Sequence, residues 1–132
     1  MSVRKFWDCG LGEGFIWMFD FERLEVYRKA HALTVSMLRL LYVEKDLDPY
    51  MKDQLKRASL GVVLNIAEGV GRVSKADKKH FYTMARGSVF ECISLVKVLF
   101  DLKTLNKSQY DQFYSGYEEI SKMLLSLFRN TK

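Results

Sequence analysis

Apolar residues recur every three or four positions along four segments of the chain, as expected for amphipathic helices. The first segment covers residues 22 to 43, and its apolar positions are Leu24, Tyr27, Leu33, Met37, Leu38 and Leu41. The second segment begins after Asp48, which suits a helix N-cap, and at Pro49, which suits the first helical position. Its apolar stripe is Leu55, Ala58, Val62, Ile66 and Gly69. Glycines at 69 and 71 predict where it ends, because glycine readily adopts the left-handed conformation that terminates helices.

Two later segments carry their own start signals. Ser74, followed three residues later by Asp77, predicts a helix that reaches about residue 103. Its stripe is Phe81, Met84, Ser88, Cys92, Leu95 and Leu99. Asn106 with Gln109 predicts the start of the last helix, with the stripe Tyr110, Phe113, Tyr117, Ile120, Leu124, Leu127 and Phe128. Since the connections are short, the sequence predicts an all-α fold, an up-down-up-down antiparallel four-helix bundle.

The helical pattern divides the chain into a bundle domain, residues 21–132, and an irregular N-terminal extension, residues 1–20. Glycines at positions 10, 12 and 14 stand among aromatic residues in the extension, which has no helical periodicity. Because Met18 immediately precedes the start of the pattern, residues 1–17 can also be interpreted as an upstream addition to the domain.

Export and membrane signals are weak in this sequence. The basic residues Arg4 and Lys5 are followed by Trp7 and Asp8 instead of an apolar run, and no stretch approaches the roughly 20 apolar residues that span a bilayer. The two cysteines, Cys9 and Cys92, are far apart and form no metal-binding cluster. We therefore expect a soluble, cytoplasmic protein with reduced thiols and no contact with membranes.

Charge is concentrated in one part of the chain. The formal net charge is +5, and residues 52–86 hold eight basic against three acidic residues, while the remainder is balanced. The eight are the candidate nucleic-acid-binding residues: Lys52, Lys56, Arg57, Arg72, Lys75, Lys78, Lys79 and Arg86. A basic hairpin of this kind could attract a polyanion. The alternative is a solvated basic face that serves solubility alone.

Catalytic and metal sites find little support in the sequence. Di-iron bundles need inward-facing Glu-x-x-His pairs, whereas the only histidines here are His31 and His80, and neither follows a glutamate at that spacing. Cys92 lies on an apolar stripe and is best interpreted as a core residue. The glycines at 69 and 71 follow a helix and lack the Lys-Ser/Thr pair of a phosphate-binding loop. We expect no enzyme, no metal and no cofactor.

Polar residues on the second and third helices follow helical spacing and predict a buried seam between them. Its members are Arg57, Asn65, Glu68, Arg72, Ser88 and Glu91. In the antiparallel hairpin, Glu91 could reach Arg57 or Arg72, and such a network would fix the register of the two helices. The functional alternative leaves both arginines free to contact phosphate groups.

The same segments carry a family resemblance. QLKRA at residues 54–58, NIAEGVGR at 65–72 and ARGSVFE at 85–91, together with FERLEVY at 21–27, resemble the 23S rRNA intervening-sequence proteins, also called four helix bundle proteins. Members are typically encoded within insertions in bacterial large-subunit rRNA genes. The resemblance implies a ring-forming homopentamer. Related bundles are accessory proteins of diversity-generating retroelements, which bind nucleic acid and a reverse transcriptase through a basic surface.

Two functions remain open at this point. The first is a non-enzymatic, oligomeric bundle that binds RNA or DNA through the basic surface of its second and third helices. The second is a structural or adaptor oligomer that recruits a protein partner and binds no nucleic acid. Hydrophobic residues make up 48% of the chain and aromatic residues 14%, which is more than one bundle core requires and favours a homo-oligomer in either case.

Overall fold

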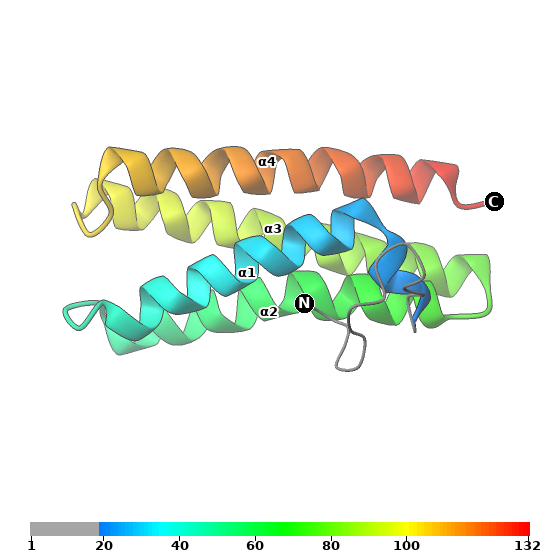
Figure 1. The fold of residues 1–132 in the computed structure, drawn as a ribbon, viewed down its shortest axis with the longest axis horizontal. Coiled ribbons are helices and arrows are strands. Elements are labelled where there is room, and N and C mark those ends of the chain that lie inside the picture. The colour runs from blue at the N-terminus through cyan, green and yellow to red at the C-terminus, as the bar shows by residue number, and fades with distance from the viewer. Residues whose placement is uncertain (1–18) are drawn as a thin grey trace, which may run out of the picture.

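The structure is a computed structural model, and it describes residues 19–132. Four long helices lie side by side and alternate in direction, as Figure 1 shows. They are α1 (Glu25–Val43), α2 (Pro49–Gly71), α3 (Lys75–Asp101) and α4 (Lys107–Asn130). Each helix packs against the next along the chain, and α1 also packs against α4, which closes the bundle. The predicted all-α, up-down-up-down four-helix bundle is confirmed.

Helix starts follow the capping signals in the sequence. The side chain of Asp48 accepts a hydrogen bond from the Met51 backbone at 3.1 Å, and Ser74 accepts one from Asp77 at the same distance. Asn106 and Gln109 bond each other's backbone N–H groups reciprocally at the start of α4. These caps satisfy backbone donors that the first turn of a helix leaves unpaired.

The first helix begins three residues later than predicted. A short 3-10 turn, η2 (Asp20–Arg23), precedes it, and Leu24 between the two is extended. Glu22, expected inside the helix, instead accepts a hydrogen bond from the Phe19 backbone N–H at 3.0 Å and so caps this turn. The predicted boundary at residue 20 thus falls inside ordered structure, while residues 1–18 of the predicted extension lie outside the described residues.

The core is formed by one face of each helix, but the centre of that face differs from the prediction on α1 and α3. On α1 the buried residues are Val26, Ala30, Thr34, Met37 and Leu41, whereas four predicted positions, Leu24, Tyr27, Leu33 and Leu38, are half-buried. On α3 the buried residues are Tyr82, Ala85, Val89, Cys92, Val96 and Leu99, so most of the predicted stripe is one position too early. The reason is that α3 packs between α2 and α4, and apolar residues flank the true centre on both sides.

Small residues bring α2 and α3 close together. A Cβ atom placed on Gly61 would lie 2.7 Å from the Ser88 hydroxyl oxygen, and one on Gly69 would lie 2.7 Å from the Tyr82 ring. These glycines are therefore required by the close approach of the two helices. The predicted left-handed glycine cap is wrong, because Gly69 and Gly71 both lie inside α2 and its C-cap, Arg72, is extended. The α2–α3 hairpin is the tightly packed half of the bundle.

Candidate nucleic-acid interface

The eight candidate basic residues do not form one surface. Lys52, Lys56 and Arg57 lie in the first half of α2, whereas Arg72 follows its last residue. At a rise of about 1.5 Å per residue, the twenty positions from Lys52 to Arg72 span roughly 30 Å. The structure therefore separates the predicted set into two groups at opposite ends of the bundle, with Arg86 in the middle of α3.

Four of these residues gather around the α2–α3 connection, and we call them the turn cluster: Arg72, Lys75, Lys78 and Lys79. Lys78 donates from Nζ to the backbone oxygen of Val70 at 2.7 Å, which satisfies a free carbonyl at the end of α2. Lys79 Nζ lies 4.9 Å from the centroid of the Phe128 ring on α4. Lys75 is exposed in the first turn of α3. The cluster thus combines helix capping with accessible charge.

Arg129 in the last turn of α4 and Lys132 beyond it lie at the same end of the molecule, because Figure 1 shows the C-terminus and the α2–α3 connection at one end of the bundle. Sequence reasoning missed both residues, because they are about fifty positions away from the turn cluster along the chain. The signal that could have found them was the predicted antiparallel topology, which puts the end of α4 beside the start of α3.

Charge is distributed unevenly along the bundle axis. Residues 68–79 carry four basic and two acidic side chains, and residues 129–132 contribute two further basic residues. At the opposite end, residues 44–53 carry two basic and four acidic side chains, and residues 101–111 carry two of each. The start of α1, residues 19–29, holds three of each sign. The end with the turn cluster is therefore the basic pole of the molecule.

The predicted buried seam was wrong. Arg57 pairs with Asp53 at 2.9 Å and its side chain is 74% exposed, and Arg72 pairs with Glu68 at 2.6 Å with 42% and 51% of the two side chains exposed. Glu91 is also exposed, and only Asn65 and Ser88 are partly buried. Because glycines and apolar side chains fill the α2–α3 contact, the charged groups remain at its hydrated edge and pair within α2.

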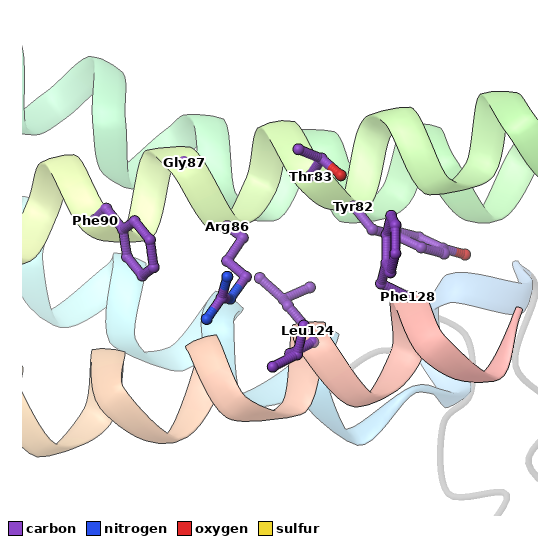
Figure 2. Close-up of a pocket in the computed structure, with 8 residues that line it drawn as sticks. Tyr82, Thr83, Arg86, Gly87, Phe90, Leu124 and Phe128 are labelled. Carbon is purple, nitrogen blue, oxygen red and sulfur yellow. The ribbon is translucent and has the colours of Figure 1, made fainter.

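A groove of about 370 Å³ runs between α3 and α4 and was not anticipated. Its apolar walls include Tyr82, Phe90, Leu124 and Phe128. Figure 2 shows the Arg86 side chain extending from α3 toward α4 between these walls. The guanidinium donates from Nε to the backbone oxygen of Ser121 at 3.3 Å, and its Cζ lies 4.8 Å from the centroid of the Phe90 ring. Sequence could not predict this groove, because its walls come from two helices.

Two kinds of site can be examined within residues 19–132, a metal centre and a reactive thiol. No three His, Cys, Asp or Glu side chains in this part of the chain could hold a metal ion together. Cys92 is fully buried, and burial raises the pKa of its thiol to about 12, so the reactive thiolate is not formed near neutral pH. The Tyr117 hydroxyl is buried beside this thiol, and burial raises the pKa of that hydroxyl as well. Within the same range, no helix has the length and apolar character needed to cross a membrane.

Comparisons with known proteins agree with this architecture. The family model described as 23S rRNA-intervening sequence protein matches residues 22–126. Among solved structures, the chain is similar to a protein of unknown function from the S23 ribosomal protein family of Bacteroides thetaiotaomicron, with a TM-score of 0.76 and 22% identity over 80% of this chain and 99% of that one. At that identity the likeness establishes the fold. A search of curated proteins gives no match.

Proposed function

The chain belongs to the 23S rRNA-intervening sequence protein family, whose model covers residues 22–126, and we propose that it binds nucleic acid through its basic pole without catalysing a reaction. Neither the family description nor the similar structure indicates catalysis. The binding surface in this proposal is the turn cluster together with Arg129 and Lys132. We place the protein in the cytoplasm, in agreement with its free, buried Cys92.

The observation that carries the proposal is the concentration of basic side chains at one end of the bundle, where Arg72, Lys75, Arg129 and Lys132 are exposed and Lys78 and Lys79 are half-buried. Within residues 19–132, the basic pole joins side chains from α2, α3 and α4. Phosphate groups along a nucleic acid backbone can contact several such cations at once, and each contact releases bound counterions. Lys52, Lys56 and Arg57 contribute less, because the acidic residues at their end of the bundle offset them and Asp53 already pairs with Arg57.

A matched pair of variants tests which end binds. Lys75→Gln/Lys79→Gln removes two charges from the basic pole, and Lys52→Gln/Lys56→Gln removes two charges from the other end. We expect duplex DNA and rRNA fragments to bind the first variant more weakly and the second variant normally. The slope of log affinity against log salt should become shallower by about 0.9 for each duplex phosphate that the variant no longer neutralises. Lys78 is left intact, because it caps α2.

Three outcomes would contradict the proposal: no binding by the wild-type protein, affinity that does not change with salt, or an equally large decrease in affinity in the two variants. Absence of binding or a flat salt response would favour the second candidate function, an adaptor that recruits a protein partner. Equal decreases would instead show that nucleic acid binds without preference for the basic pole. A specific observation supports that candidate: Tyr42, Val43 and Tyr50 are about 70% exposed near the α1–α2 connection, far from the basic pole. Exposed apolar side chains of this size often mark a protein interface.

We also propose that the chain assembles as a homopentamer. The family resemblance suggests the ring, and the exposed apolar residues provide surface for contacts between copies. A ring would bring five basic poles to bear on one nucleic acid and raise its avidity through effective concentration. Light scattering at micromolar concentration tests this, because a mass equal to the 15.4 kDa chain would rule out the ring.

A further inference from the structure

Three cation–aromatic pairs lie between α3 and α4. Phe128, Arg86 and Phe90 line the groove, whereas Lys79, Lys97 and Tyr114 lie outside its lining. The first joins Lys79 with Phe128 at 4.9 Å, and the second joins Arg86 with Phe90 at 4.8 Å. The third joins Lys97 with Tyr114, where the amine lies 5.8 Å from the ring centroid. In each pair the cation comes from α3. The groove therefore presents Arg86 among aromatic rings, and on α3 Lys79 precedes and Lys97 follows the lining residues.

The cations form a stripe on one side of α3 because of their spacing along the helix. Lys75, Lys79, Arg86 and Lys97 are separated by four, seven and eleven residues, steps that return to the same side of a helix. From Lys79 to Lys97 the stripe is about 27 Å long at about 1.5 Å per residue. Its first two members belong to the basic pole, so the stripe continues the proposed phosphate-binding surface into the groove.

Arg86 is the polar group at the centre of the groove. Only its Nε is hydrogen-bonded to the protein, and the other guanidinium nitrogens have no partner within residues 19–132. The Phe90 ring is 50% exposed, so the guanidinium leaves much of this ring accessible. On α4, Lys122 pairs with Glu118 at 4.0 Å, and neither residue lines the groove. Arg86 is the one charged side chain among the residues that line the groove, which therefore carries positive charge at its centre.

We propose that this groove binds a single strand of nucleic acid, with unpaired bases stacked on Phe90, Phe128 and the Arg86 guanidinium and phosphates facing the lysines. The proposal deepens the nucleic-acid function above and rests on it. Basic grooves lined with aromatic side chains are suited to single strands, because unpaired bases offer free faces for stacking. A duplex hides those faces inside its own stack, so it can use only the basic pole.

Two matched comparisons test the stacking. The ligands are an oligothymidylate of about 16 nucleotides, an abasic strand of equal length and charge, and the corresponding duplex. The variants are Phe90→Leu, which removes a ring from the groove, and Tyr50→Leu, which removes an exposed ring from the other end of the bundle. We expect the wild type to bind the oligothymidylate more tightly than the abasic strand, by about 5-fold to 150-fold for each stacked base.

Phe90→Leu should abolish most of this preference, whereas Tyr50→Leu should keep it. The affinity for the duplex should be the same in the wild type and in both variants. Equal affinity of the wild type for the abasic strand and the oligothymidylate would overturn the single-strand groove, although the basic pole could still bind duplex. An unchanged preference of Phe90→Leu for the oligothymidylate over the abasic strand would also overturn the single-strand groove. A lower mass of Phe90→Leu in light scattering would identify the groove as a contact between copies of the chain. Absence of all binding by the wild type would instead refute the underlying nucleic-acid function.

Discussion

Replacement of Gly69 by alanine should loosen the α2–α3 hairpin. The added Cβ would lie 2.7 Å from Cε1 of Tyr82 and 3.0 Å from Cβ of Phe81. Tyr82 is buried and Phe81 Cβ is attached directly to the α3 backbone, so relief requires movement of the helix and not only of a flexible side-chain end. Gly69→Ala is therefore an overpacking substitution.

Two effects of opposite sign determine the size of the change. Overpacking of a well-packed contact typically costs about 1 to 3 kcal/mol, and replacing glycine in a helix interior gains up to about 1 kcal/mol. Gly69 lies two residues from the end of α2, where the helix-propensity gain is smaller. We expect a net loss of about 1 to 2 kcal/mol, or roughly 4 to 8 °C in Tm for a domain of this size.

Urea unfolding followed by circular dichroism, at one fixed chain concentration, measures the change. Gly87→Ala is the control, because no atom lies within 4 Å of a Cβ placed there and the residue is inside α3. This control should be more stable than the wild type by about 0.5 to 1 kcal/mol. A Gly69→Ala protein at least as stable as the wild type would refute the close packing described for α2 and α3.

Three further substitutions or conditions give measurable outcomes. In a Cys9→Ser background, Cys92 should react with a thiol reagent at pH 8 only after unfolding. The pKa of this thiol in the folded protein is about 12, above the ordinary value of 9.0. The buried neutral thiol should therefore stabilise the fold below pH 9, and this contribution should be lost as the pH rises from 9 toward 12. Rapid labelling of the native protein would contradict its burial. Asn106→Ala should lower the free energy of unfolding by about 1 kcal/mol through loss of the α4 cap, whereas an unchanged urea midpoint would argue against the cap. Glu68→Ala should lower the free energy of unfolding by less than about 1 kcal/mol, because the ion pair of Glu68 with Arg72 is exposed. A larger decrease would support the predicted buried seam instead.

Local signals in the sequence determined the helices. The caps at Asp48, Ser74 and Asn106 act within four residues, so they start helices in the same places whatever the rest of the chain does. Apolar periodicity and short connections then specified four antiparallel helices. The one wrong boundary, at the start of α1, arose because Glu22 caps a preceding turn, and a helical pattern does not distinguish that role from a position inside the helix.

Only tertiary packing decided which residues share a surface. The α3 core face could not be centred from its own sequence, because contact with both α2 and α4 sets its orientation. Arg57 and Glu68 follow a stripe of α2 and Glu91 lies on α3, yet all three remain hydrated because Gly61 and Gly69 let the helix backbones meet without them. Likewise, the basic pole and the α3–α4 groove combine residues that are distant in sequence. Periodicity along one helix carries no information about its rotation against two neighbours, and that rotation determines both surfaces.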